Sequence, residues 1–189
     1  MDLYEVIDNR RTIRVFNEGA TEGQLNKIIL AGTKAPSAVN RQPWEFIIID
    51  SQDIIDQLSD IKYKQTRNNP PDKVKGDLKA IEKLAQAQKD SFRNSSIVAV
   101  CHLVDWERSV WMCLENISLA AVAEGLGTGI VLFWGEGQKE AGKVLGLPEE
   151  YQLTAILKIG VPAEAGYPRD ENPYAPRRPE FSWIHKDRF

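Results

Sequence analysis

Four short apolar runs, rich in β-branched and aromatic residues, recur along this chain of 189 residues. They are "WEFIIID" at 44–50, "SSIVAVCHLV" at 95–104, "GTGIVLFW" at 127–134 and "LTAILKIG" at 153–160. Runs of this length and composition predict buried β-strands. Helical patterns lie between them and helix outweighs strand, so the sequence predicts one α+β domain without internal repeats.

One of the helical patterns is unusually apolar. The stretch "WERSVWMCLENISLAAVAEGLG" at 106–127 has apolar residues around most of its circumference, which predicts a central helix buried on several sides. Another helix is expected to begin at Thr21, whose spacing to Gln24 is that of a capping box, and to end before Pro36. Shorter helices are expected at 2–11, from Ser51 to about 61, around 78–85 and at 141–145.

Two polar stretches interrupt this alternation. "YKQTRNNPPDKVKGD" at 63–77 predicts a long loop, which is either a lid or a plain linker. The segment 161–189 is rich in proline and charge but keeps aromatic residues such as Phe181 and Trp183. This composition predicts a C-terminal tail that docks on a surface, within a single domain spanning 1–189.

The composition excludes several classes of function. Twenty-four basic and 27 acidic residues give a net charge of -3, without the broad basic face of a nucleic-acid-binding domain. No stretch approaches the roughly 20 apolar residues of a membrane helix, and the first residues lack a signal-peptide layout. Cys101 and Cys113 have no metal-ligand spacing. A cytoplasmic protein with no metal, nucleic-acid or membrane partner is therefore expected.

An arginine cluster stands near the start, in "DNRRTIRVF" at 8–16. If this segment is helical, Arg10 and Arg14 point the same way, with Arg11 and the hydroxyl of Thr12 beside them. Guanidinium groups in such a cluster suit a phosphate. The alternative is a solvated basic helix end, which the stretch by itself favours.

Two further stretches could bind a ligand. In "APSAVNRQPWEF" at 35–46, Ser37, Asn40 and Gln42 offer hydroxyl and amide groups that suit a planar heterocycle, or that satisfy a local turn. "APRRP" at 175–179 adds an arginine pair, which is either a second phosphate contact or an exposed basic tail.

Catalytic side chains are not apparent. Ser37 stands in no nucleophile elbow, and neither histidine has a motif around it. "EGLGTG" at 124–129 reads as the glycine end of a helix, and the following residues lack the lysine and hydroxyl of a P-loop. If the chain is an enzyme, something other than its side chains is expected to carry out the chemistry.

Taken together and in this order, these stretches resemble the FMN-dependent nitroreductases. "RRTIRVF", "APSAVNRQPWEF", "AAVAEGLGTG", "LGLPEEY" and "PRRP" carry the resemblance, which runs over nearly the full length of the chain. It implies a mixed, mostly antiparallel sheet flanked by helices, with a long central helix near the axis of a homodimer. It also implies that the flavin lies at the interface between the two subunits.

The resemblance further implies which residues bind FMN. Those facing the phosphate and ribityl chain would be Arg10, Arg11, Thr12 and Arg14, joined from the tail by Arg177 and Arg178. Those packing on the flavin from the other subunit would be Pro36, Ser37, Ala38 and Asn40, with Gln42 nearby, and Val131, Leu132 and Phe133 would supply backbone contacts to the ring. Many relatives have a second serine where this chain has Ala38. The stretch "AQAQKDSF" at 85–92 does not clearly match the Asn and Lys with which some relatives contact the flavin.

The implied chemistry belongs to the cofactor. NADH or NADPH would reduce FMN, and a nitroaromatic, quinone or similar small acceptor would then oxidise it in a ping-pong mechanism, with no catalytic side chain. Two other interpretations remain open. One is a specialised member of the superfamily, such as a dehalogenase or a flavin-fragmenting enzyme, and the other is a flavin-binding protein without enzymatic activity.

Overall fold

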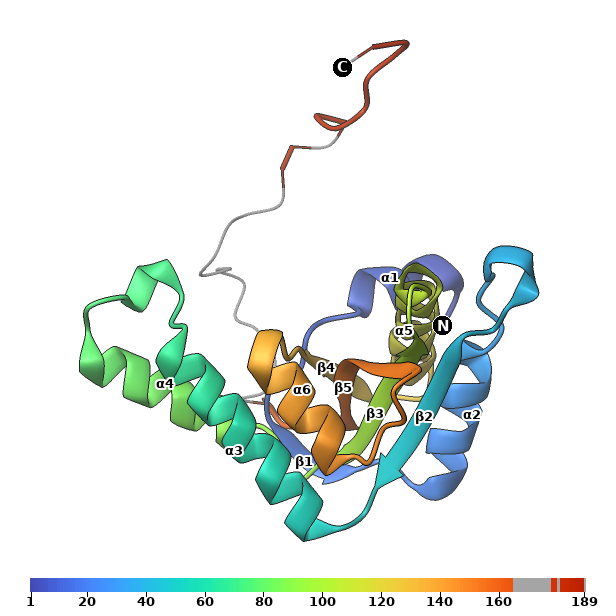
Figure 1. Ribbon diagram of the computed structural model, residues 1–189. Coiled ribbons are helices and arrows are strands. Elements are labelled where there is room, and N and C mark those ends of the chain that lie inside the picture. Colours follow the sequence, from blue (N-terminus) through green and yellow to red (C-terminus); the bar gives the residue numbers. More distant parts are fainter. Residues whose placement is uncertain (165–177, 180, 189) are drawn as a thin grey trace.

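An antiparallel sheet lies at the centre of the fold (Figure 1). In the computed structural model the described residues are 1–164, 178–179 and 181–188. Within them the strands are β1 (Phe16–Gly19), β2 (Trp44–Ile49), β3 (Ser96–Leu103), β4 (Gly127–Val131) and β5 (Tyr151–Pro162). β5 pairs with β1, β3 and β4, and β3 also pairs with β2, all antiparallel. The four strands expected from the apolar runs are confirmed, while β1 was not expected.

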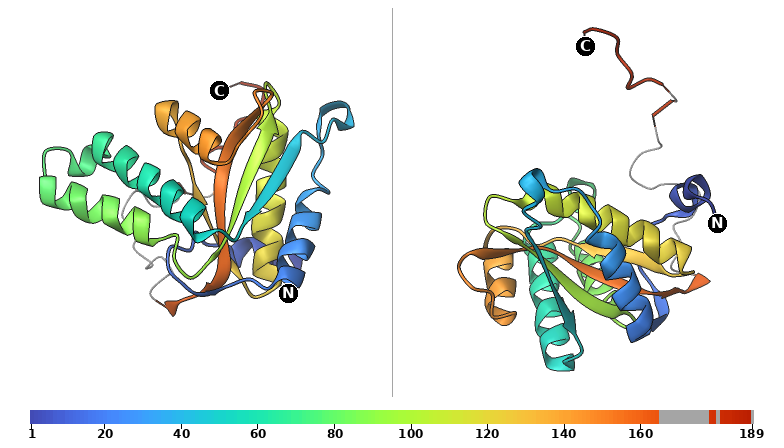
Figure 2. Two further views of the ribbon diagram at one scale, coloured as in Figure 1. Left: turned by 60° about the horizontal axis from the view of Figure 1, so that its bottom comes forward. Right: turned by 90° about the vertical axis from the view of Figure 1, so that its right-hand side faces the viewer.

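Helices cover both faces of this sheet (Figure 2). α2 (Glu22–Gly32) and α5 (Glu107–Ala123) cover one face, and α3 (Gln52–Asn68) and α6 (Gly135–Val144) cover the other. α1 (Leu3–Asn9) packs against α5, and α4 (Leu78–Asp90) packs against α3. Two single 3-10 turns, η1 (Ala38–Asn40) and η2 (Asp72–Val74), complete the described elements. This arrangement confirms the α+β class with flanking helices.

The alternation of side chains along β5 separates two apolar cores. Leu157 and Ile159 belong to the core beneath α2 and α5, whereas Ile156 belongs to the core beneath α3 and α6. Successive side chains of a strand point to opposite faces. Lys158, between Leu157 and Ile159, is therefore placed on the face that α3 covers.

The predicted central helix is α5. Its sheet-facing side is fully buried at Val110, Cys113 and Ile117, which pack with α2 and the middle of the sheet. On its other side Trp111 and Met112 remain 37% and 44% exposed. Burial on several sides is thus only partial, and the described residues leave Trp111 and Met112, the apolar strip of α5, uncovered.

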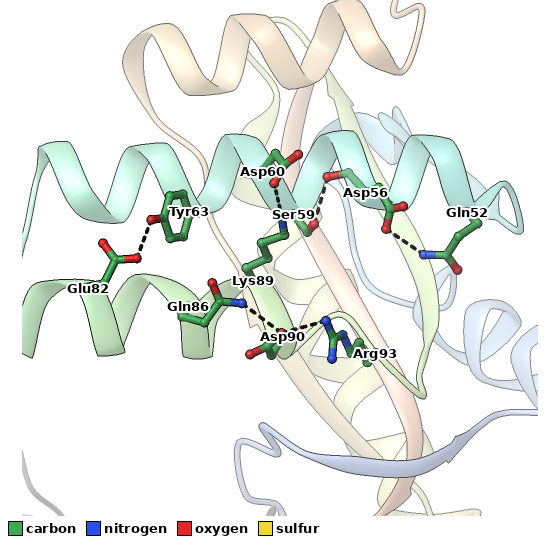
Figure 3. Close-up of polar contacts among 10 residues, drawn as sticks. All are labelled: Gln52, Asp56, Ser59, Asp60, Tyr63, Glu82, Gln86, Lys89, Asp90 and Arg93. Atoms are coloured by element: carbon green, nitrogen blue, oxygen red, sulfur yellow. Dashed lines mark hydrogen bonds and ion pairs between the residues drawn. The ribbon is translucent and has the colours of Figure 1, made fainter.

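The prediction of a long polar loop at 63–77 is wrong in its first half, because α3 continues to Asn68. Figure 3 shows why: α4 lies alongside α3 and supplies partners for its last turns. The hydroxyl of Tyr63 donates to Glu82 Oε1 at 2.5 Å, and Arg67 Nε lies 3.3 Å from Glu82 Oε2. Gln65 and Thr66 are buried against the rest of the fold. These contacts depend on tertiary packing and leave no periodic apolar signal.

The arginine segment at 10–14 is not helical, which corrects the geometry expected for it. α1 ends at Asn9, and the Arg10 backbone turns to an extended conformation with ψ of 123°. The chain then runs beside β4: the Ile13 amide donates to the Thr128 carbonyl at 2.8 Å, and Thr12 forms an isolated parallel bridge to Thr128. Because Ile13 is 98% buried by this route, packing against the sheet outweighs one further helical turn.

The predicted tail begins within β5, which ends at Pro162, whereas residues 178–179 and 181–188 lie away from the sheet and its helices (Figure 1). Phe181, Trp183 and Ile184 are 72%, 51% and 65% exposed. Docking of this tail on a surface stays a prediction. Across the helices that the structure describes, none combines the length and the apolar character needed to cross a membrane.

Candidate functional site

The segment that leaves β4 is held in place by polar side chains of α3. Lys62 Nζ and Gln65 Nε2 both donate to the Leu132 carbonyl, at 3.0 and 3.2 Å. The Trp134 amide in turn donates to Gln65 Oε1 at 3.0 Å. β4 ends at Val131, so Leu132 and Phe133 follow the strand instead of lying within it. These bonds fix the backbone stretch that is expected to meet a flavin ring.

Lys158 lies near Lys62 and is 97% buried. Its register partner in β4 is Gly129, and a Cβ at that position would lie 2.9 Å from Lys158 Cε. Glycine at 129 therefore leaves the space that the lysine occupies. Within the described residues, Lys158 forms no hydrogen bond and no ion pair.

Three cations converge here from different elements, and we call Arg14, Lys62 and Lys158 the cationic cluster. Burial, together with the positive charges of Arg14 and Lys62, lowers the pKa of Lys158 to about 8. Burial also lowers the pKa of Lys62 to about 8. None of the three forms a salt bridge to a carboxylate in the described part of the chain. Lys62 and Lys158 are buried whereas Arg14 is exposed, and buried positive charge without a counter-ion favours a bound anion or electron-rich group.

Aromatic side chains flank the cluster. Lys62 Nζ lies 4.6 Å from the centre of the Trp134 ring and 6.0 Å from that of Phe133. Phe133 is buried, whereas Trp134 is 49% and Leu132 41% exposed. The site therefore combines positive charge with an apolar wall, which suits a planar, electron-rich ligand.

Only some of the residues predicted to bind the FMN phosphate lie close together in this chain. Thr12 lies beside β4, and Arg14 joins the cationic cluster. Arg10 Nε lies 3.8 Å from Glu115 Oε1 of α5, and Arg11 Nη1 donates to the carbonyls of Asp8 and Arg10. Arg11 thus caps the end of α1, as the simpler interpretation of the cluster expected.

The two arginines predicted from the tail are not seen to join the phosphate residues. Arg177 lies outside the described residues. Arg178 donates to the Ser182 carbonyl at 2.7 Å and lies 5.9 Å from the centre of the Trp183 ring. These contacts are internal to the tail, so a role of Arg178 at a phosphate stays a prediction.

The loop at 36–42 is apart from the cluster within one chain. It precedes β2, which β3 separates from β5 and hence from Lys158. Ser37 Oγ accepts a hydrogen bond from the Gln42 amide at 2.9 Å, and Gln42 Nε2 donates to the Asn40 carbonyl at 3.4 Å. The polar groups of the loop therefore have local partners, as the turn interpretation expected, and contact of Pro36, Ser37, Ala38, Asn40 and Gln42 with a flavin stays a prediction.

Backbone strain marks the tip of this loop. Val39 has φ of 48° and is 88% exposed, with Asn40 and Gln42 also at positive φ. A β-branched residue in the left-handed region is a genuine outlier, and such strain clusters at functional sites. The tip therefore presents an apolar side chain outward in a defined, strained conformation.

Sequence reasoning missed three residues of the site, namely Lys62, Gln65 and Lys158. Lys158 carried a usable signal, because it is the only charged residue in the apolar run at 153–160. Lys62 and Gln65 fell within or beside a segment interpreted as polar loop. Their position on a helix facing β4 could not be seen without the pairing of α3 with α4.

The sequence of this chain is similar to those of known proteins. The model of the Nitroreductase family matches residues 7–161. A putative NAD(P)H nitroreductase of Escherichia coli is 30% identical over 173 residues, covering 86% of this chain and 89% of that protein. An iodotyrosine deiodinase of Thermotoga neapolitana is 28% identical over 181 residues, covering 89% and 94%.

A solved structure is similar over its whole length. The crystal structure of an oxidised iodotyrosine deiodinase bound to FMN and 3-iodo-L-tyrosine has a TM-score of 0.75 to this chain, with 24% identity and 100% of each chain covered. This similarity confirms the fold that the sequence resemblance implied.

Proposed function

Since this chain belongs to the Nitroreductase family, we propose that it is an FMN-dependent oxidoreductase. In this proposal NADH or NADPH donates electrons, and a nitroaromatic, quinone or similar small molecule accepts them. The observation that carries the proposal is the cationic cluster, which has no counter-ion among the described residues and is bonded through Lys62 to the fixed stretch at 132–134. The solved deiodinase with the same fold contains FMN.

The donor set fits FMN. An isoalloxazine ring offers carbonyl oxygens and ring nitrogens as acceptors, and it becomes more negative on reduction. Arg14, Lys62 and Lys158 offer donors and positive charge, and the backbone at 131–133 offers amide and carbonyl groups beside them. The chain thereby binds and orients the ring and compensates its charge.

The phosphate would be held by Thr12 and by the guanidinium groups of Arg10 and Arg11. Their present partners, the Glu115 carboxylate and the carbonyls at the end of α1, lie at the surface and are readily exchanged. Arg177 and Arg178 would add donors from the tail. When bound, FMN supplies hydride acceptance and electron transfer, so no side chain has to act as a general acid or base.

A second copy of the chain would complete the site. The loop with Pro36, Ser37, Ala38 and Asn40 lies apart from the cluster of its own chain, since β3 separates β2 from β5. α5 exposes Trp111 and Met112, and α1, which packs against α5, exposes Leu3, Tyr4 and Ile7. We propose that this face forms a homodimer and that each loop covers the partner's flavin.

The test is steady-state oxidation of NADH and NADPH by the purified protein loaded with FMN, using menadione and a nitroaromatic acceptor. Acceptor-dependent turnover with parallel double-reciprocal plots supports the ping-pong oxidoreductase. Tight FMN binding without turnover for any donor would identify a flavin-binding protein. Failure to bind FMN contradicts the proposal as a whole.

Reductive dehalogenation is the second candidate, because the Thermotoga relative named iodotyrosine deiodinase matches almost as well as the nitroreductase relative. The discriminating measurement is iodide release from 3-iodo-L-tyrosine by the reduced protein, compared with reduction of a nitroaromatic at equal concentration. Iodide release as the faster reaction would replace the first proposal with the second.

A further inference from the structure

Lys158 is a buried cation for which the described chain provides no counter-ion. Only 3% of it is exposed, and its charged neighbours Arg14 and Lys62 are themselves positive. A buried charge without a partner opposes folding. The stability of the fold therefore does not explain the presence of Lys158, and its position indicates contact with a ligand.

The surroundings of Lys158 include residues proposed to contact the flavin ring. Its register partner Gly129 stands two residues before Val131, and the neighbouring Lys62 is bonded to the Leu132 carbonyl. These are the residues proposed to meet the isoalloxazine. Of the residues proposed for the phosphate, Arg10 and Arg11 lie at α5 and at the end of α1, whereas Thr12 lies beside β4 at Thr128.

On the basis of the proposed function, we propose that Lys158 is a positioning residue for the flavin ring, whose electron-rich acceptor atoms supply the partner that the described residues lack. The ammonium group donates a hydrogen bond to an acceptor of the ring and fixes the orientation of the ring. Reduction makes the ring more negative, so the contact also favours the reduced ring and raises its reduction potential.

The groups around Lys158 determine how binding depends on pH. Arg14 faces it from the segment before β1 and Lys62 faces it from α3, whereas its register partners Ile97 in β3 and Gly129 in β4 carry no charge. Since the pKa of Lys158 is lowered to about 8, the amine is partly neutral above that pH in the free protein. A hydrogen-bond acceptor raises the pKa again, so flavin binding should take up protons above pH 8.

The first test compares Lys158→Met with the exposed control Lys143→Met in the flavin-free full chain. Loss of one charge-assisted hydrogen bond predicts about 10- to 150-fold weaker binding of FMN and of riboflavin alike. The melting temperature of the flavin-free protein should rise, because a buried charge is removed. Lys143→Met should alter neither. A purely structural lysine would not combine a more stable protein with weaker flavin binding.

Each other outcome overturns the inference. A loss confined to FMN would assign Lys158 to the phosphate, and unchanged affinity for both flavins would remove it from the site. Wild-type protein that binds neither flavin would overturn the proposed function as well. Failure of the proposed function is thus distinguishable from failure of the inference about Lys158.

The second test needs no variant. Titration calorimetry of wild-type protein with riboflavin at pH 8.5, in two buffers of different ionisation enthalpy, should show net proton uptake, and affinity should fall as the pH rises further. Riboflavin removes any contribution from phosphate ionisation. Zero proton uptake or proton release would contradict the inference, even if Lys158→Met fails to fold.

Discussion

Lys158 in β5 and Gly129 in β4 are register partners, and the lysine occupies the space that a side chain at 129 would fill. A Cβ on Gly129 would lie 2.9 Å from Lys158 Cε and 3.4 Å from its Nζ, and it would also press on the Ile13 carbonyl. Because residue 129 has no side chain, both the buried Lys158 and the extended segment at 10–14 can pack against β4. The cationic cluster depends on this pair.

Gly129→Ala is expected to disturb the cluster. Because the Ile13 carbonyl belongs to the backbone and cannot move aside easily, overpacking should reduce the free energy of unfolding by about 1–3 kcal/mol. Flavin affinity should fall as well. Chemical denaturation and flavin titration measure the two effects.

Gly23→Ala is the matched control for this substitution. Gly23 lies in the first turn of α2, and a Cβ there meets nothing within 4 Å. Alanine should be neutral or more stable by about 0.5–1 kcal/mol, since it restricts the unfolded chain. Equal stability changes at 129 and 23 would contradict the close approach of Gly129 and Lys158.

The stability of the flavin-free protein should rise with pH above about 8. The pKa values of Lys62 and Lys158 in the folded protein lie near 8, below the usual 10.5, so the unfolded state binds more protons between these values. The upper limit is roughly 3 kcal/mol per lysine. Urea denaturation between pH 7 and pH 9.5 measures the slope.

Lys158→Met isolates the contribution of one lysine to this slope. Burial raises the pKa values of Cys101 and Cys113 to about 12, so these thiols oppose the rise once unfolded thiols ionise. The cysteines are common to both proteins, and their effect cancels in the difference. A wild-type slope equal to that of the variant would show that Lys158 titrates normally in the folded protein.

Arg10→Ala should distinguish binding of the FMN phosphate from binding of the flavin ring. If Arg10 exchanges Glu115 for the phosphate, its loss weakens FMN binding by about 10- to 150-fold and leaves riboflavin binding unchanged. Fluorescence titration with both flavins provides the measurement. Arg93→Ala, which removes an exposed arginine paired with Asp90, is the control and should change neither affinity. Equal loss for both flavins would place Arg10 at the ring instead.

Met112→Glu should dissociate the proposed homodimer, because it places a charge in the uncovered apolar strip of α5. Light scattering over a dilution series should show monomers at concentrations where the wild type is dimeric, with weaker flavin binding. Leu78→Glu is the control, since Leu78 is 81% exposed on α4, away from that strip. A wild-type protein that is monomeric with bound FMN would rule out a shared site.

The α+β class, four of the five described strands and the capping box at Thr21 and Gln24 followed from the sequence, because apolar runs and capping are local patterns. The short β1 was not foreseen, since Phe16–Gly19 carries one buried apolar residue and owes its conformation to pairing with β5. The last turns of α3 depended likewise on α4, through contacts such as that of Tyr63 with Glu82. The elements that could be predicted are those with a strong local sequence pattern, whereas β1 and the end of α3 depend on tertiary contacts.

For the candidate site, the sequence by itself determined the residue types: the arginines at 10–14, the amide-rich loop at 36–42 and the family they indicate. Only the tertiary structure decided which of them meet. It turned Arg10 and Arg11 toward α5 and α1, brought Arg14 to Lys62 and Lys158, and left the loop two strands away. The physical reason is that charge and hydrogen-bonding capacity belong to single residues. The distance between two charges, and the burial that makes it matter, arise when β4, β5 and α3 pack together.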